Sequence, residues 1–212
     1  MSSGLVGHWK FNEKSGIITN DSSRYHNTGT LTGATLPKWG EKGIIFDGVD
    51  DYVDAGNDIS VREIGNLTVA AWVYSNSVIG NKNILGKDNS AGRGWTFRFT
   101  GNVLQLETDG SVNVVQSTTV LSANTWYFVA FTATNASGTK QDFILYINGR
   151  ADTIENENKL ILSPINLNIG RRAYSGNEEY WSGLIAEARI YNRALSQLEI
   201  KRLYNSTKHK YI

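Results

Sequence analysis

Alternation of apolar and polar residues with a period of two recurs along almost the whole chain. The run Trp95–Thr100 places its three aromatic residues on one face and two threonines and an arginine on the other. Successive side chains of a strand point to opposite faces, so this pattern predicts half-buried strands. The run Trp126–Ala133 is apolar on both faces, which is typical of a central strand covered on both sides.

Turn-forming residues separate these runs. Asn148-Gly149 lies between Phe143–Ile147 and Arg150–Ile154, and Asn-Gly between two such runs predicts a tight hairpin. The chain has 21 glycines and only 2 prolines. A high glycine content suits a chain of many short strands joined by turns. Further strands are predicted at Leu5–Phe11, Gly43–Phe46, Asp51–Val53, Leu67–Tyr74, Ile84–Lys87, Val103–Thr108, Val112–Ser117, Leu167–Gly170 and Gly183–Tyr191. The pattern as a whole predicts an all-β sandwich or jelly roll.

One helix is predicted near the end of the chain. Ser196 and Glu199 have the spacing of a capping box, in which each side chain satisfies a backbone N–H of the other residue. Apolar residues at 195, 198, 200 and 203 favour a short helix over Ser196–Tyr204. No Pro-rich, charged or low-complexity linker divides the chain, so residues 1–212 are expected to form a single domain.

Composition excludes several classes of protein and site. The chain has no cysteine, which excludes disulfides, zinc–thiolate sites and a thiol nucleophile, and its 3 histidines are scattered. A formal net charge of +1 argues against nucleic acid as a partner. No apolar run approaches the roughly 20 residues of a membrane span, so no membrane insertion is expected. No signal peptide pattern is visible at the N-terminus.

Several segments, taken in order, resemble the laminin-G-like domains of the concanavalin A-like lectin/glucanase superfamily. The resemblance covers nearly the whole chain and is most specific in the closing segment. The matching segments are Gly4–Phe11, Ser15-Gly16, Asp21–Ser23, Phe46–Val53, Leu67–Tyr74, Ile84–Lys87, Trp126–Ala130, Leu145–Gly149 and Gly183–Ser196. The resemblance implies a two-sheet antiparallel jelly-roll β-sandwich with one concave sheet. It also implies a scaffold role for Trp9, Phe46, Trp72, Trp126 and Tyr191.

The glucanases of this superfamily carry Glu-x-Asp-x-x-Glu on one strand, which aims two carboxylates into a cleft. The near match here begins at Glu107-Thr-Asp109 but has Val112 in place of the second Glu. Glu155, Glu157 and the pair Glu178-Glu179 are expected in solvated loops. We therefore expect a protein without catalytic activity.

A carbohydrate site needs flat aromatic faces and planar polar groups, and the predicted loops carry both. The candidate residues are Trp95, Arg93, Asn83, Asn113, Tyr174, Asn177, Tyr180 and Trp181. The alternative is that Trp95 and Trp181 begin strands and only pack the sandwich.

The resemblance also implies a structural Ca²⁺, and Asn12 and the Asp47-Gly48 turn match that site in position. Asp21 could form or supplement another calcium site. Ala186 stands where the family commonly has Asp, so the expected carboxylate is missing from the closing strand. Asp21 has a second interpretation, in which it only stabilises the turn Asp21–Ser23.

These features lead to three functional hypotheses. The first is a non-catalytic, lectin-like carbohydrate-binding or adhesion module whose partner is a glycan or a cell-surface or particle component. The second is a structural, decoration or attachment protein of a virus particle or cell envelope with the same fold. The third is a degenerate glycoside hydrolase. The resemblance implies an extracellular, cell-surface or virion-surface location.

Overall fold

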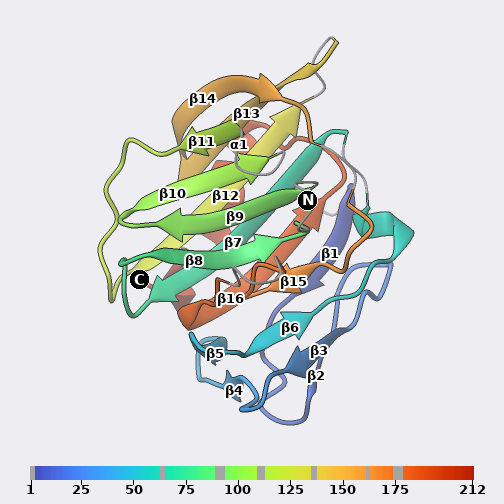
Figure 1. Ribbon diagram of the computed structural model, residues 1–212, viewed down its shortest axis with the longest axis vertical. Coiled ribbons are helices and arrows are strands. Elements are labelled where there is room, and N and C mark those ends of the chain that lie inside the picture. The colour runs from blue at the N-terminus through green and yellow to red at the C-terminus, as the bar shows by residue number, and fades with distance from the viewer. Residues whose placement is uncertain are drawn as a thin grey trace.

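A computed structural model describes residues 3–62, 65–88, 94–108, 113–134, 138–160, 163–173 and 179–212. Two antiparallel sheets are stacked face to face, and a helix lies behind one of them (Figure 1). We call the sheet nearer the viewer in Figure 1 the front sheet and the other the back sheet. The arrangement confirms the predicted all-β sandwich. None of the helices in the described ranges has the length and apolar composition of a membrane span.

The back sheet has β16 (Ser182–Tyr191) near its centre, paired along one side with β7. Along its other side β16 pairs first with β5 and then with β1, and a bulge interrupts the strand between Ala186 and Arg189. The other strands of this sheet are β14 (Arg150–Asn158), β13 (Lys140–Ile147), β12 (Trp126–Thr134), β7 (Leu67–Ser75), β5 (Ile44–Asp47), β4 (Lys38–Trp39) and β1 (Leu5–Trp9).

The front sheet runs from β11 at one edge to β2 at the other. Its strands in spatial order are β11 (Asn113–Gln116), β10 (Val103–Thr108), β9 (Trp95–Thr100), β8 (Asn81–Gly86), β15 (Asn168–Ile169), β6 (Tyr52–Asp54), β3 (Gly29–Thr32) and β2 (Ile18–Thr19). The sequence did not predict β2, β3 or β4, which have only two to four residues each. Such short segments are too brief to show a period of two.

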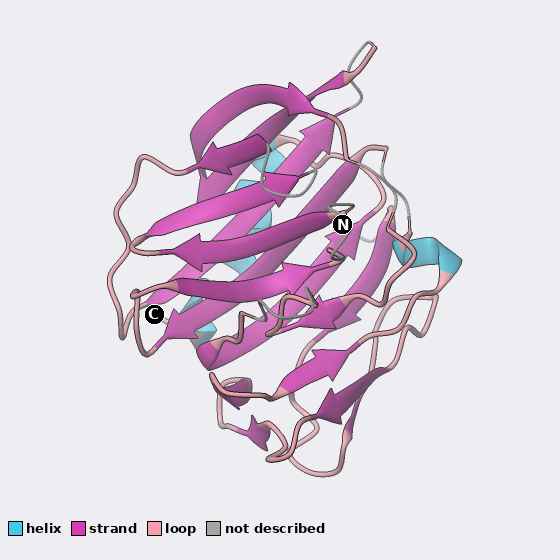
Figure 2. Cartoon of the chain, in the orientation of Figure 1, coloured by secondary structure: helices cyan, strands magenta, loops and turns pink. Residues whose placement is uncertain are grey.

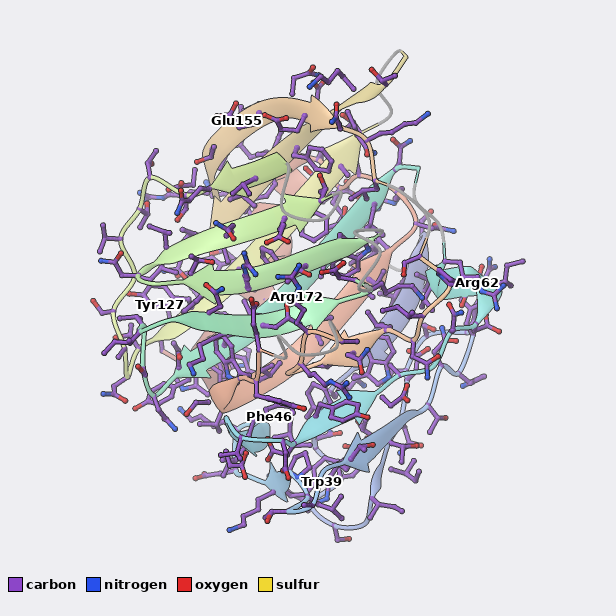
Figure 3. The ribbon with its side chains drawn as sticks, viewed as in Figure 1. Trp39, Phe46, Arg62, Tyr127, Glu155 and Arg172 are labelled. Carbon is purple, nitrogen blue, oxygen red and sulfur yellow. The ribbon has the colours of Figure 1, made fainter. Side chains whose placement is uncertain are left out.

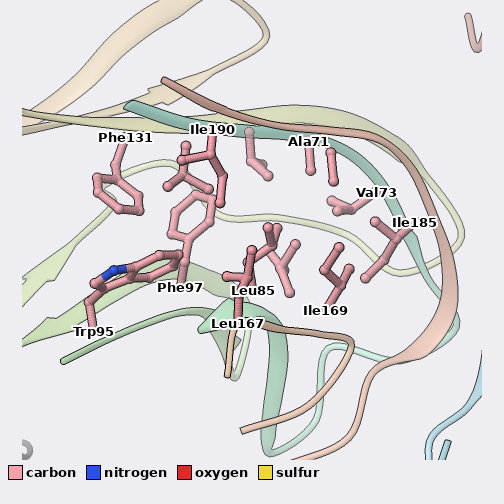
Figure 4. Packing of buried hydrophobic residues seen from close by; sticks show 14 of the residues in the cluster. Ala71, Val73, Leu85, Trp95, Phe97, Phe131, Leu167, Ile169, Ile185 and Ile190 are labelled. Carbon is pink, nitrogen blue, oxygen red and sulfur yellow. The ribbon is translucent and has the colours of Figure 1, made fainter. Parts of the chain in front are cut away.

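The main core lies between the sheets. Figure 4 shows Trp95 and Phe97 of the front sheet packed against Phe131 and Ile190 of the back sheet. The aromatic residues that alternate along β9 therefore face inward, as the sequence predicted. Four of the five residues with an expected scaffold role are nearly or fully buried, and Trp126 is partly buried.

A second apolar layer covers the opposite face of the back sheet. Helix α1 (Gln197–Thr207) and the short helix η2 (Lys208–Lys210) lie over it (Figure 2). The indole Nε1 of Trp72 donates to Thr207 Oγ1 at 2.8 Å, and its ring stacks on Tyr211 with centroids 4.5 Å apart. The predicted capping box between Ser196 and Glu199 is present, although α1 extends three residues beyond Tyr204. A third short helix, η1 (Ile59–Val61), precedes β7.

Candidate functional site

The outer face of the front sheet carries polar side chains that are nevertheless buried. Thr96 and Arg98 of β9 point to this face because the aromatic residues that alternate with them point into the core. Glu107 of β10 pairs with Thr96, and Asn83 of β8 pairs with Arg98. The segments on either side of residues 174–178 cross this face, joined by an isolated bridge between Arg171 and Tyr180.

Five of these side chains form what we call the ionic cluster: Asp88, Arg98, Glu107, Arg172 and Glu179. Arg172 donates to Asp88 Oδ2 and to Glu107 Oε1, each at 2.6 Å. Arg98 donates from Nη1 to both oxygens of Glu179 at 2.8 and 2.9 Å, and from Nη2 to Glu107 Oε2. The two guanidinium groups thus join carboxylates from three separate parts of the chain (Figure 3 labels Arg172 over the middle of this sheet).

Burial sets the electrostatics of the ionic cluster, because each of its residues is at most 7% exposed. Burial raises the pKa of Asp88, and the charge of Arg172 opposes that shift. Burial alone would lower the pKa of Arg172, but Asp88, Glu107 and Glu179 raise it on balance. Two cations and three carboxylates leave a formal charge of −1 among the five groups. A cluster of this kind tolerates removal of one member poorly, because the remaining charges stay buried.

Three half-exposed residues beside the ionic cluster form what we call the rim: Tyr52, Arg171 and Tyr180. The guanidinium carbon of Arg171 lies 4.5 Å from the centre of the Tyr52 ring and 6.0 Å from that of Tyr180. Asn83 Nδ2 donates to the carbonyl oxygen of Arg171, which ties the rim to β8. The rim therefore combines aromatic rings with a planar cation at the surface.

Several buried polar atoms at this face have no hydrogen-bond partner among the residues that the structure describes. They are Asn83 Oδ1, Asp88 Oδ1 and Arg171 Nε. Asn83 is 0% exposed and Asp88 is 3% exposed. Unpaired polar atoms are costly inside a protein, so these three are candidates to bond water or a ligand.

The two tryptophans predicted to bind sugar lie in the core. Trp95 is 4% exposed and packs edge-on against Phe131, with centroids 5.5 Å apart (Figure 4). Trp181 is 0% exposed, packs against Phe99 at 5.2 Å, and donates to the carbonyl oxygen of Leu184. Neither ring offers a face to a ligand, which favours the packing role that the sequence left open for both.

The other predicted site residues divide into two groups. The structure brings Asn83 and Tyr180 to the same face, since both contact Arg171. Arg93, Tyr174 and Asn177 lie outside the described residues, and Asn113 begins β11 with no described side chain.

Asp21 and the Asp47-Gly48 turn are too far apart to share one calcium site. Asp21 lies beside Trp9, which pairs with Ala188, whereas Asp47 pairs with Ser182. Six residues of strand separate these positions, or about 20 Å. No group of three or more acidic or histidine side chains in the described ranges could hold a metal ion.

The individual side chains are also engaged within the protein. Asp21 accepts from the backbone of His8 and of Ser23, each at 2.7 Å, and Asp47 accepts from Val49 N at 2.7 Å. Asn12 is exposed, Gly48 forms a turn at a φ of 82°, and Ala186 lies in the apolar layer under α1. These residues do not fit the calcium ligand set that the resemblance implies.

The expectations for the acidic residues were partly wrong. Glu179 is 6% exposed in the ionic cluster rather than in a solvated loop, and Glu178 lies outside the described residues. Glu155 and Glu157 lie on β14 rather than in a loop. Sequence reasoning missed Arg98 and Arg172 as partners of Glu107, and it missed Asp88 as a partner of Arg172. The alternation of β9 did assign Arg98 to the polar face, but nothing indicated which acids would meet it.

Comparison with known proteins agrees with this architecture. A family model described as the concanavalin A-like lectin/glucanases superfamily matches residues 47–201. The chain belongs to this superfamily. No curated protein sequence matches it.

Solved structures of similar fold include toxin binding domains and a sialidase. The binding domain of botulinum neurotoxin DC, in complex with rat synaptotagmin II, matches with a TM-score of 0.71 and 16% identity. The same binding domain in complex with SialylT gives 0.73 and 16%. The match covers 97% of this chain and 52% of each toxin chain.

A mutant of Trypanosoma rangeli sialidase displaying trans-sialidase activity gives a TM-score of 0.73 at 16% identity. The match covers 99% of this chain and 34% of the sialidase chain. The chain thus spans about half of the toxin structures and about a third of the sialidase. At these identities the likeness is one of fold.

Proposed function

We propose that this protein is a non-catalytic, lectin-like module that binds a glycan at the rim on the outer face of the front sheet. The observation that carries the proposal is the guanidinium of Arg171 beside two half-exposed tyrosine rings. Tyrosine rings pack against the C–H faces of sugars, and a guanidinium donates to their hydroxyl groups.

The ionic cluster gives the rim a rigid base. Arg172 directly follows Arg171, and its guanidinium is held by three carboxylates. Tyr180 directly follows Glu179, which accepts from both clustered arginines. Two rim residues are thus each anchored by a buried neighbour, which lowers the entropy lost when a ligand binds.

The structural neighbours support a binding role. The titles of two of them describe a toxin binding domain in complex with a protein, rat synaptotagmin II, or with SialylT. By analogy, the partner would be a glycan or glycoprotein at a cell surface or on a particle. The protein would then act outside the cell or on a virion surface.

The contacts of Glu107 support a role without catalysis. A retaining glycosidase needs one carboxyl group free to protonate the leaving oxygen and a second free to attack the sugar. The two carboxylate oxygens of Glu107 accept from Arg172 and Arg98, and those of Glu179 accept from Arg98. Either carboxylate would have to leave a buried ion pair to react.

A glycan array followed by isothermal titration with the best ligand tests the proposal. We expect Arg171→Ala and Tyr180→Ala each to weaken binding about tenfold or more, as loss of a central contact does. Arg24→Ala is a matched control, because Arg24 lies 4.8 Å from the centre of the Tyr25 ring in a similar pair elsewhere. Absence of any glycan ligand, or unchanged binding by both rim variants, would reject the proposal.

A further inference from the structure

A pocket lies where the hairpin between β13 and β14 meets the end of α1, on the side of the back sheet away from the rim. Its volume is about 590 Å³. Gly149 of the hairpin turn has a φ of 75°, and a Cβ there would lie 2.9 Å from Tyr204 Cβ. The turn and the helix are therefore packed tightly against each other beside the pocket.

Three cationic side chains line this pocket. Lys201 and Lys208 have the i, i+7 spacing that places them on one helix face, with Asn205 between them, and Arg150 begins β14 opposite. Within the described ranges none of the three cations forms a salt bridge, although Lys208 lies 5.6 Å from the centre of the Tyr204 ring.

The lining carries one carboxylate, Asp152, and its oxygens are already used. Thr118 N donates to Oδ1 at 2.6 Å and Thr119 N to Oδ2 at 3.2 Å. Burial alone would raise the pKa of Asp152, but the hydrogen bonds from Thr119 and Thr118 lower it. Asp152 is thus an anion that faces the 118–119 turn. The residues that line the pocket, three cations and Asp152, therefore carry a formal charge of +2, which is larger than the +1 of the whole chain.

The amide groups of the pocket add hydrogen-bond donors. Asn148 Oδ1 accepts from Phe128 N at 3.0 Å, which leaves its Nδ2 to donate elsewhere. The exposed side chain of Asn205 makes no hydrogen bond within the described residues. Three cations with two amides can hold an oxyanion and also the hydroxyl groups beside it.

We propose that this pocket binds an acidic saccharide, with Arg150, Lys201 and Lys208 holding a sulfate ester on the sugar. The volume lies within the range of small-ligand sites, roughly 300–1,000 Å³. The exposed cations supply the charge, and the two asparagines supply contacts to hydroxyls. The site is independent of the rim, which lies on the opposite face of the sandwich.

Isothermal titration with a sulfated disaccharide, its desulfated counterpart and inorganic sulfate tests the assignment. We expect the sulfated sugar to bind, the desulfated sugar to bind at least about tenfold more weakly, and inorganic sulfate to bind more weakly than the sulfated sugar. Added salt should weaken binding, since the cations are exposed. Equal binding of both sugars would overturn the role of the sulfate group, and equal binding of inorganic sulfate would overturn the role of the saccharide.

Variants locate the site. The double variant Lys201→Gln, Lys208→Gln should lose about tenfold or more in affinity for the sulfated sugar. The double variant Lys38→Gln, Lys159→Gln removes the same charge from exposed lysines elsewhere and should bind like the wild type. Equal loss in both would show a general charge effect and refute the pocket. Arg171→Ala should leave this binding unchanged, which separates it from any failure of the rim.

Discussion

Glu187 lies at the bulge of β16, where β5 and β1 meet along the same side of that strand. The residue is 4% exposed, and its side chain accepts from Arg189 Nη2 at 2.6 Å and from Lys210 Nζ. Burial alone would raise the pKa of Glu187, but His8, Lys210 and Arg189 lower it to about 2 from 4.5. The folded protein therefore holds Glu187 as an anion more strongly than the unfolded chain does.

The variant Glu187→Gln removes this charge and keeps the shape of the side chain. A pKa depressed from 4.5 to about 2 corresponds to about 3 kcal/mol of stability at neutral pH. That contribution is fully present above pH 4.5 and is lost as the pH falls toward 2. We expect the variant to be about 3 kcal/mol less stable than the wild type near pH 7, and the difference to shrink toward zero in acid.

Urea unfolding of both proteins over this pH range measures the difference. Glu155→Gln is a control, because Glu155 is exposed on β14 (labelled in Figure 3). Its substitution should change stability by less than about 0.5 kcal/mol at any pH. A Glu187→Gln deficit that is the same in acid as at neutral pH would refute the electrostatic reasoning and assign the loss to packing or to the backbone.

Four further changes have defined outcomes in equilibrium unfolding. Burial and the neighbouring charge of Asp47 raise the pKa of Asp51 to about 7. The stability of the wild type should therefore decrease as the pH rises from about 4 through 7, because the folded protein must then ionise this buried carboxyl group. Asp51→Asn should remove this decrease. Arg172→Leu should cost about 3–5 kcal/mol because it leaves three buried carboxylates with one guanidinium. Ser196→Ala should cost about 0.5–2 kcal/mol through loss of the capping box. Gly149→Ala should destabilise the protein by about 1 kcal/mol or more, since its Cβ would meet α1 at a positive φ.

The sequence predicted the sandwich because its signals are local. Alternation along β9 assigned Trp95 and its aromatic neighbours to one face, and the Asn148-Gly149 hairpin and the helix cap depend on adjacent residues. Three of the short strands were missed, since a strand such as β4, with only the two residues Lys38–Trp39, offers no period to detect.

The candidate site was harder to predict because its contacts are distant in the chain. Arg98 and Glu179 are 81 residues apart, and Asp88 and Arg172 are 84 apart. Neither pairing leaves a spacing signature. Trp95 and Trp181 suggested a carbohydrate site because they lie next to polar loops in the sequence. The strand alternation that points Trp95 into the core also removes it from the surface.

The position of β16 has a consequence for how the chain folds. It lies between β7 on one side and β5 and β1 on the other, yet it is the last strand of its sheet in the sequence. During synthesis, β1 and β5 therefore remain unpaired with β16 until this last strand, which joins them to the rest of the sheet, has been made. Pairing over such long sequence separations slows folding, and until then β1 and β5 expose unpaired edges. A ribosome-bound chain that ends before β16 should accordingly depend on chaperones.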